Sequence, residues 1–324
     1  MRHSNYKRME TEMKILVIFT GGTIGSTIEG EYISTDCNKP YVILDKYNNS
    51  YPNEIEWDTM NPYTILSENV TSKTYELLYE AVKKGIDGDY DGIIITHGSD
   101  TLQYSAAFLS LAFGSDIIPV MLVSSNYVLE DERSNGMENF RCSVDFIENK
   151  YGRGVFVPYR NTGEFCKIHY GNCLMPHAAY SDNLVGIEGD YYGIYTDRGF
   201  VRGKSKALED CICDVPDSDK EGSGIYNVHV SPGVEYPDLK DNTKAVLLHA
   251  YHGGTICVES EDLRDFVTKV KERNIPLYLV GANPEMEYES CKEYQSNGII
   301  VLPYVSPIYA YMRLWMNNGN WSKK

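Results

Sequence analysis

The chain has 324 residues, of which 42% are hydrophobic and 23% charged, and its formal net charge is −16. This composition is typical of a globular protein with ample material for a core, and it excludes a disordered or fibrous chain. The charge argues against binding to nucleic-acid backbones or to an anionic membrane surface, because both need clustered Lys and Arg. A negative net charge of this size is also expected simply because it keeps a protein in solution. At about 150 residues per domain, the length predicts two domains.

The N-terminus and the cysteines indicate a cytoplasmic protein. Residues 1–13 are polar and contain no apolar stretch, so we expect a disordered lead-in and no secretory signal. No run of about 18 apolar residues occurs, and we expect no transmembrane helix. The 8 cysteines form no CxxC pair, which argues against a zinc ribbon or a thioredoxin site. A chain of this length needs no disulfide for stability, and we expect reduced thiols.

Short apolar runs alternate with amphipathic segments in the first half of the chain. The runs 14–19 and 92–96 are rich in β-branched residues and predict strands that are buried on both faces of a parallel sheet. Between them, residues 73–84 have helical spacing and stop at Gly85, which predicts an amphipathic helix with a glycine C-cap. The same patterns predict helices over 101–113 and about 136–149, and strands at 119–123 and 154–159.

The second half begins with a change of character. Residues 185–210 contain short alternating runs broken by Gly and Tyr, which predicts a hairpin, and the acidic, Pro- and Gly-containing segment 214–224 predicts a linker. We therefore expect an α/β fold, with a larger N-terminal parallel-sheet domain over 13–213 and a smaller α/β domain over 225–324. The strands and helices expected in the second domain are 227–230, 245–251, 260–273, 276–281, 299–304 and 307–316.

Two polar loops follow predicted strands, at the strand ends where ligands of open α/β sheets bind. The first loop contains Gly21 and Gly22, and Thr23 follows them. Paired glycines let the backbone approach a ligand and expose N–H groups. A hydroxyl among such donors is the arrangement that acyl transfer needs, a nucleophile beside an oxyanion hole. The same loop also fits a plain strand-to-helix turn.

The second loop spans residues 96–101 and contains His97-Gly98-Ser99-Asp100. Asp100, with Gln103 three residues on, fits the N-cap of a capping box. His97 fits a buried histidine whose ring is hydrogen-bonded. The chain contains no GxGxxG after a strand, no GxxxxGK[ST], no HExxH and no GxSxG, so the enzyme classes that those motifs indicate are disfavoured.

Together the two loops resemble the two signature segments of the bacterial-type L-asparaginase family. Further segments are similar to the family's substrate-holding stretch, to its RSDGxxN stretch and to the start of its C-terminal domain. The resemblance covers nearly all of the chain from Met13 onward. The matching segments are TGGTI at 20–24, ITHGSDTL at 95–102, LSENVT at 66–71, RSNGMEN at 133–139, HVSPG at 229–233 and AVLLHAYHGGTI at 245–256.

The resemblance implies hydrolysis of the side-chain amide of L-asparagine, or of a close relative, to aspartate and ammonia. The reaction passes through a threonyl acyl-enzyme and uses no metal or organic cofactor. Thr23 is then the nucleophile, and Ser99 stands at the second catalytic hydroxyl position, where the family usually carries Thr. Tyr32 matches the family's activating tyrosine on a lid, by spacing alone; it also fits an ordinary residue of a Tyr-rich chain. Asp100 binds the substrate's α-ammonium, which needs a carboxylate partner.

The resemblance also implies a substrate-binding set. Ser67 holds the α-carboxylate of the substrate and Glu68 assists with its ammonium group. Gly22 and Gly98, one from each signature loop, belong to the same set. The expected ligand is therefore a small-molecule amide with amino-acid character, with no nucleic-acid or membrane partner.

One catalytic residue of the family is missing at its expected place. The family's lysine falls at Tyr170 or Gly171, and the nearest lysine, Lys167, needs a shift of about four residues in the alignment. That lysine lowers the cost of deprotonating the second hydroxyl. Lys167 reaches Ser99 through a local backbone shift, or His169 or Tyr170 faces Ser99, or nothing does.

Three functions are therefore compared. The first is an amidohydrolase, supported by the intact hydroxyl and carboxylate set. The second is an asparaginase-fold protein that binds an amino acid or a different amide and hydrolyses it weakly or not at all, which the missing lysine favours. The third is the asparaginase-like subunit of a tRNA-dependent amidotransferase. That subunit carries an extra N-terminal domain, whereas about a dozen residues precede the first strand here, and the charge of −16 suits tRNA poorly.

The resemblance also implies self-assembly. In the family, the C-terminal domain of a neighbour completes each site, so we expect a homodimer or homotetramer with two-fold symmetry. Glu285, Glu287 and Glu289, which follow a predicted strand, are candidate residues donated in this way. They also fit a solvated run of charges.

Overall fold

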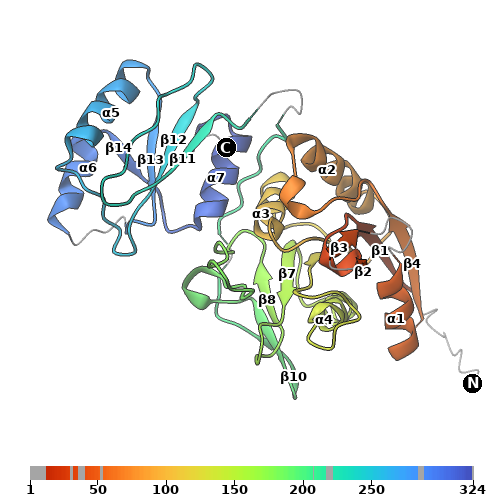
Figure 1. Cartoon of the computed structure of the whole chain (residues 1–324). Coiled ribbons are helices and arrows are strands. Elements are labelled where there is room, and N and C mark those ends of the chain that lie inside the picture. The colour runs from red at the N-terminus through yellow and green to blue at the C-terminus, as the bar shows by residue number, and fades with distance from the viewer. Residues whose placement is uncertain are drawn as a thin grey trace, which may run out of the picture.

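The computed structural model describes residues 12–29, 32–35, 41–51, 54–206, 208–216, 222–283 and 288–322. These residues form an eight-stranded sheet in the N-terminal part and a four-stranded sheet in the C-terminal part, besides a two-stranded hairpin (Figure 1). The expected α/β fold, with the larger sheet first, is confirmed. The division of the chain into domains at 213 and 225 stays a prediction, and residues 217–221 of the expected linker lie outside the described residues.

The eight-stranded sheet is mixed, not purely parallel. Its strands follow the order β10-β9-β8-β7-β6-β5-β1-β4, in which the β4-to-β7 side is parallel and the β8-to-β10 side is antiparallel. The predicted hairpin within 185–210 is confirmed by β9 and β10. The strands are β1 (Met13–Phe19), β4 (Ile55–Met60), β5 (Gly92–Thr96), β6 (Val120–Val123), β7 (Val155–Tyr159), β8 (Lys167–Tyr170), β9 (Gly193–Thr196) and β10 (Gly199–Arg202).

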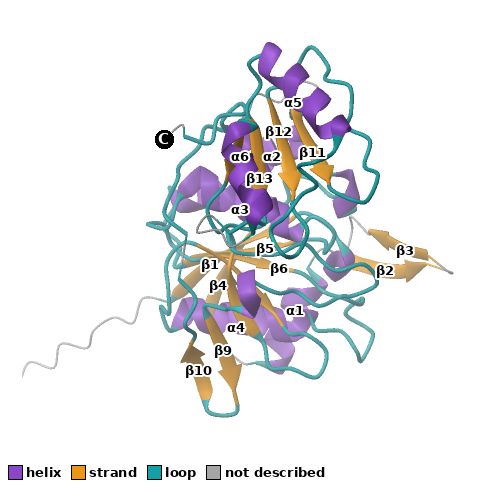
Figure 2. Ribbon diagram, turned by 90° about the vertical axis from the view of Figure 1, so that its left-hand side faces the viewer, coloured by secondary structure: helices purple, strands orange, loops and turns teal. Residues whose placement is uncertain are grey.

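Helices cover both faces of this sheet, which is why its central strands read as continuous apolar runs. Figure 2 shows α2 (Ser72–Ile86) and α3 (Leu102–Phe113) above the sheet, and α1 (Val42–Ser50) and α4 (Gly136–Glu148) below it. Side chains from α2 and α3 join one apolar core and side chains from α1 and α4 join the other.

The glycine at the end of α2 does not cap the helix, contrary to the prediction. The helix runs one residue past Gly85, to Ile86, and Asp87 is its C-cap. A Cβ at Gly85 would lie 2.6 Å from Cδ1 of Ile93 and 2.7 Å from Cδ2 of Leu16. Glycine there lets the helix pack closely on β1 and β5 and does not adopt a left-handed cap conformation.

The C-terminal sheet is parallel, with strand order β11-β12-β13-β14. It is covered by α5 and α6 on one side and by α7 on the other (Figure 1). The predicted elements are confirmed, with boundaries moved by a few residues, and the short helix α6 (Lys292–Ser296) was not predicted. The confirmed elements are β11 (Ile225–His229), β12 (Ala245–His249), α5 (Glu261–Glu272), β13 (Leu277–Val280), β14 (Ile299–Val301) and α7 (Pro307–Met316).

Helix α7 connects the two sheets. Its residues Ala310 and Leu314 pack against the C-terminal sheet, whereas Ile308 and Met312 belong to the core that α3 and α2 build over the N-terminal sheet. Both sets of side chains are buried. The two parts of the chain therefore share one helix.

Two further observations bear on the expectations. In the part of the chain that the structure describes, no helix is long and apolar enough to span a membrane. The described cysteines are unpaired, in agreement with the expected reduced thiols.

Candidate active site

Three loops meet at the carboxyl edge of the eight-stranded sheet, and backbone hydrogen bonds hold them together. Gly22 N donates to the carbonyl of Ile65 at 3.2 Å, and Ile65 N donates to the carbonyl of Thr20 at 3.1 Å. The Thr20 hydroxyl donates to the carbonyl of Thr96 at 2.7 Å. The loop after β1 is thus fixed both to the segment before α2 and to the end of β5.

Two glycines bring the backbones of these loops into direct contact. Gly22 has a φ of +77°, and a Cβ there would overlap the backbone N of Gly98. A Cβ on Gly98 would in turn overlap the Oγ of Ser67. Glycine is required at both positions, because any side chain would push the loops apart. The predicted substrate-binding residues Gly22, Gly98 and Ser67 therefore lie against one another.

The two candidate catalytic hydroxyls flank this contact. Thr23 begins the short 3-10 helix η1 (Thr23–Gly25), directly after Gly22, and Ser99 directly follows Gly98. Both residues are half-buried. The structure thus gathers Thr23, Ser99 and Ser67 around one small region, although they are up to 76 residues apart in the sequence.

Asp100 does not cap α3, so the alternative role as a capping-box residue is wrong. The N-cap is Thr101, whose side chain makes no cap hydrogen bond, and the helix begins at Leu102. The Thr101 hydroxyl instead donates to the carbonyl of Ser67 at 2.9 Å. The Asp100 carboxylate is exposed, and no hydrogen bond or ion pair engages it within the described ranges. It therefore remains available to a ligand.

Glu68 supplies a second exposed carboxylate on the neighbouring loop. It lies in the 3-10 helix η2 (Ser67–Asn69), next to the buried Ser67. As with Asp100, none of the described residues forms an ion pair with it. Two exposed carboxylates that pair with no described cation favour a ligand with an ammonium group.

His97 is buried and both of its ring nitrogens are hydrogen-bonded, as the interpretation of this residue as a buried histidine predicted. Its Nδ1 lies 2.8 Å from the carbonyl of Gly98, and its Nε2 lies 2.8 Å from the hydroxyl of Ser105. Because a carbonyl only accepts, Nδ1 carries the proton and Nε2 accepts from Ser105. Burial lowers the pKa of His97, which keeps the ring neutral. Its role is to orient the Gly98 carbonyl.

Lys167 is engaged away from the candidate site. Its Nζ forms an ion pair with Glu164 at 2.6 Å and lies 5.5 Å from the ring centre of Tyr191. It belongs to β8, which β6 and β7 separate from β5, the strand before Ser99. Three strand spacings amount to about 14 Å. The Lys167 side chain therefore has a structural role in the outer part of the sheet, where it pairs with Glu164.

The other two residues considered for the relay belong to the same strand. His169 is fully buried opposite Val157 of β7. The hydroxyl of Tyr170 accepts from Arg202 at 2.9 Å. Neither residue has a described contact with Ser99, so β8 offers no substitute for the family's lysine in this arrangement.

The remaining candidate residues are placed only in part. Tyr32 lies on β3 (Tyr32–Thr35), which pairs antiparallel with β2 (Ser26–Glu29) in a hairpin that projects from the body (Figure 2). Glu289 begins a 3-10 helix, whereas Glu285 and Glu287 lie outside the described residues. In the described part of the chain, no group of three or more His, Cys, Asp or Glu is placed to hold a metal ion.

Sequence reasoning missed the residues that hold the loops in place. Thr101 fastens Ser67, and Thr20 fastens the end of β5. Both threonines stand beside residues that the motifs single out. Their position next to the motif residues could have drawn attention to them, but the sequence does not reveal which atoms they hydrogen-bond.

Glycine-lined loops, hydroxyls and exposed carboxylates lie together at the carboxyl edge of the sheet, the edge at which ligands of open α/β sheets bind. The model of a family described as "Asparaginase, N-terminal" matches residues 14–175. The chain belongs to the asparaginase family.

Curated relatives and solved structures agree with this assignment. A glutamyl-tRNA(Gln) amidotransferase subunit from Sulfurisphaera tokodaii is 34% identical over 259 residues, which are 76% of this chain and 52% of that protein. The corresponding protein from Pyrococcus abyssi is 29% identical over 230 residues, 68% of this chain and 51% of that protein. The chain thus spans about half the length of these relatives.

Among solved structures, the thermostable L-asparaginase from Thermococcus kodakarensis superposes with a TM-score of 0.74 at 21% identity, over 95% of this chain and 93% of that one. A probable cytoplasmic L-asparaginase from Campylobacter jejuni gives a TM-score of 0.73 at 19% identity, over 96% of this chain and 97% of that one. These likenesses show the asparaginase fold.

Proposed function

We propose that the protein is an amidohydrolase that cleaves the side-chain amide of L-asparagine, or of a close relative, to aspartate and ammonia. The observation that carries this proposal is the mutual contact of Gly22, Gly98 and Ser67, which gathers the hydroxyls and carboxylates of the neighbouring residues around two side-chain-free backbone segments. Membership of the asparaginase family supports it. The proposed reaction needs no metal or organic cofactor, since a hydroxyl and backbone donors supply nucleophile and oxyanion hole.

The proposed binding mode follows the charges of an amino acid. The exposed carboxylates of Asp100 and Glu68 pair with the α-ammonium of the substrate. The Ser67 hydroxyl donates a hydrogen bond to the α-carboxylate. Gly22 and Gly98 let the substrate approach the loop backbone, because no Cβ stands between them.

In the proposed mechanism the Thr23 oxygen attacks the amide carbon and the C–N bond breaks. The nitrogen leaves as ammonia after it takes up the proton of the Thr23 hydroxyl, and a threonyl ester remains. Water then adds to the ester carbon, the acid is released, and Thr23 regains its proton. Backbone N–H groups of the glycine loop stabilise the oxyanion of each step. Tyr32 and Ser99 are the proposed proton relays.

The test is ammonia release from L-asparagine, L-glutamine, D-asparagine and larger amides, by wild type and Thr23→Val. Valine keeps the shape and β-branching of threonine, so we expect an unchanged melting temperature. Loss of the nucleophile costs several kcal/mol of transition-state stabilisation, and turnover should fall by about a thousandfold or more. Binding of L-aspartate, measured by calorimetry, is the control and should persist. Unchanged turnover in Thr23→Val would identify another nucleophile.

A second candidate is binding with weak or absent hydrolysis. The specific observation in its favour is the Lys167–Glu164 ion pair in β8, which occupies the nearest lysine in the outer part of the sheet. With Lys167 engaged there, no described residue of β8 helps to deprotonate the Ser99 hydroxyl, which makes that step costly. The two candidates are distinguished by the same assay: tight aspartate binding without ammonia release from any amide supports the second.

A third candidate is a component of a glutamyl-tRNA(Gln) amidotransferase, as the curated relatives are. The net charge of −16 opposes direct contact with tRNA. Ammonia release that depends on added tRNA and a partner protein would favour this role. Ammonia release by the protein alone, unaffected by tRNA, would favour free amide hydrolysis.

We also propose that the protein works in the cytoplasm as a homodimer or homotetramer on a small-molecule amide. Its free thiols support a reducing compartment. The exposed position of Asp100 and Glu68 supports a site that a neighbouring copy covers. The candidate residues for that contribution are still Glu285, Glu287 and Glu289.

A further inference from the structure

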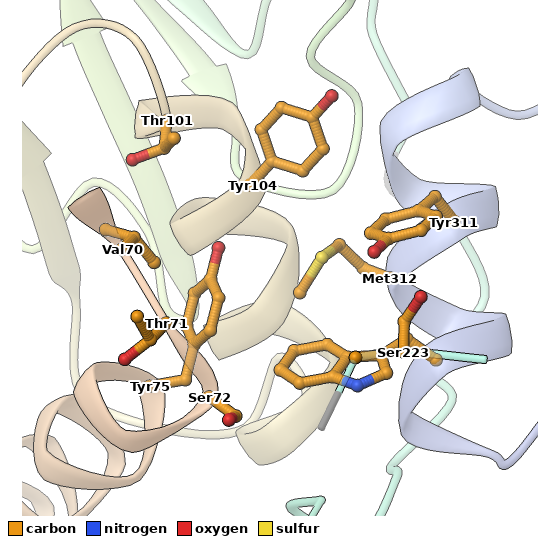
Figure 3. A pocket seen from close by; sticks show the side chains of 11 residues that line it. Val70, Thr71, Ser72, Tyr75, Thr101, Tyr104, Ser223, Tyr311 and Met312 are labelled. Carbon is orange, nitrogen blue, oxygen red and sulfur yellow. The ribbon is translucent and has the colours of Figure 1, made fainter. Parts of the chain in front are cut away.

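A cavity of about 430 Å³ lies between α2, α3 and α7, apart from the loop that carries Thr23 (Figure 3). Its walls come from both parts of the chain, because α2 and α3 cover the N-terminal sheet and α7 follows the C-terminal one. This volume lies in the range of sites that take up small organic molecules.

The walls of the cavity are aromatic and uncharged. Four rings line it, those of Tyr75, Tyr104, Tyr311 and Trp315, together with small apolar and hydroxyl-bearing residues. No Asp, Glu, Lys, Arg or His is among the described residues that line it. Burial raises the pKa of both Tyr75 and Tyr104, so the phenols stay neutral.

The rings come from opposite walls. Tyr104 of α3 and Tyr311 of α7 have ring centres 6.3 Å apart with planes at 82°, and Tyr75 of α2 and Trp315 of α7 are 5.4 Å apart at 56°. Figure 3 shows Tyr75 and Tyr104 on one side of the opening and Tyr311 with Met312 on the other. Each of these pairs is in direct contact, so the rings form one aromatic surface, and a flat ring that packs against it meets aromatic edges and faces, the geometry that aromatic groups prefer.

We propose that this cavity binds a neutral, planar aromatic molecule of the size of an indole or a purine base. A charged molecule would lose its hydration without meeting a counter-charge, which weakens its binding relative to that of a neutral one. The hydroxyls of Thr71, Thr101 and Ser223 on the wall are already bonded, to Thr74, Ser67 and Ile225, so recognition of the ring rests on its aromatic contacts. The site is separate from the Thr23 loop, although Thr101 on its wall also holds Ser67 in place.

The test is isothermal titration of the full chain with indole, indole-3-acetate and tryptamine, which share one ring and differ in charge. We expect saturable binding of indole, with weaker binding of the anion and of the cation. Tyr104→Leu and Tyr311→Leu, on separate helices, should each weaken indole binding about tenfold, the loss of one aromatic contact. If one of the two variants fails to fold, the other decides.

Tyr79→Leu is the matched control, because Tyr79 lies on α2 but stacks on Phe113 at 4.9 Å and does not line the cavity. It should bind indole as wild type does. Absence of saturable indole binding, equal losses in all three variants, or tighter binding of tryptamine or indole-3-acetate would each overturn the proposal. Thr23→Val should keep indole binding, so this result and the failure of amide hydrolysis are separable.

Discussion

Gly22 and Gly163 share a backbone φ of +77° but have opposite surroundings. A Cβ on Gly22 would overlap Gly98, whereas a Cβ on Gly163 would meet nothing within 4 Å. The pair therefore separates the cost of the left-handed conformation from the cost of steric overlap at the candidate site.

We expect Gly163→Ala to lower the free energy of unfolding by about 1 kcal/mol, the cost of the conformation alone. Gly22→Ala should cost more and should abolish ammonia release, because the loops that carry Thr23 and Ser99 must separate. Chemical denaturation and the ammonia assay measure the two effects. Equal destabilisation by both substitutions, with activity kept, would show that the Gly22–Gly98 contact does not build the site.

At the scale of single residues, the sequence predicted which residues lie together at the candidate site but not the hydrogen bonds that hold them there. The two glycine-bearing motifs singled out Thr23, Gly98 and Ser99, and the structure brings their loops together. The cap of α3 was not predictable, because Asp100 and Thr101 are both residue types that favour an N-cap. Only the packed loops show that Thr101 turns to Ser67 and leaves Asp100 exposed.

Among the elements, strand β8 decides whether Lys167 takes part in catalysis. We expect Lys167→Met to leave turnover and its pH profile unchanged, because β6 and β7 stand between β8 and β5. Loss of the partly exposed ion pair with Glu164 should cost less than about 1 kcal/mol of stability. The measurement is a pH–rate profile across neutral pH beside Ser99→Ala, which should lower turnover. A large fall in the turnover of Lys167→Met would make this lysine the relay after all.

The same strand buries a histidine, and this makes the protein sensitive to acid. Burial, with a smaller effect of Lys167, lowers the pKa of His169 to about 4, against an ordinary 6.5. The unfolded chain therefore binds this proton first as the pH falls. The stabilising contribution is complete above about pH 6.5 and is lost toward pH 4, by about 3 kcal/mol. His169→Phe should flatten the dependence of the unfolding free energy on pH in that window. An equally steep dependence in the variant would contradict the assignment.

The elements that the sequence missed share a physical cause. β4 lies at the edge of the sheet and is partly exposed, so it shows no continuous apolar run. β8 has only four residues with mixed polarity, and α1 ends in the polar stretch Asn48-Asn49-Ser50. Periodicity identifies elements that bury a whole face. Short or marginal elements are fixed by their neighbours instead.

For the whole molecule, the exposed carboxylates of Asp100 and Glu68 predict an assembly in which a second copy covers the site. Sedimentation at micromolar concentration should give a dimer or tetramer, with activity that falls on dilution as the assembly dissociates. Glu289→Gln, on the C-terminal part, should then lower turnover without changing the sedimentation coefficient. A strictly monomeric species with full activity would exclude the shared site.

Helix α7 also constrains the order in which the chain acquires its structure during synthesis. Residues 307–316 complete the core over α2 and α3, yet they follow every strand of both sheets. After the ribosome has synthesised α3, roughly ten to forty seconds pass before it has synthesised α7, at about 5–20 residues per second. During that interval the part of α3 that packs against α7 has no native cover. The ribosome-bound chain therefore exposes apolar surface until α7 is made. We expect chaperones to bind ribosome-bound chains that are stalled before residue 307.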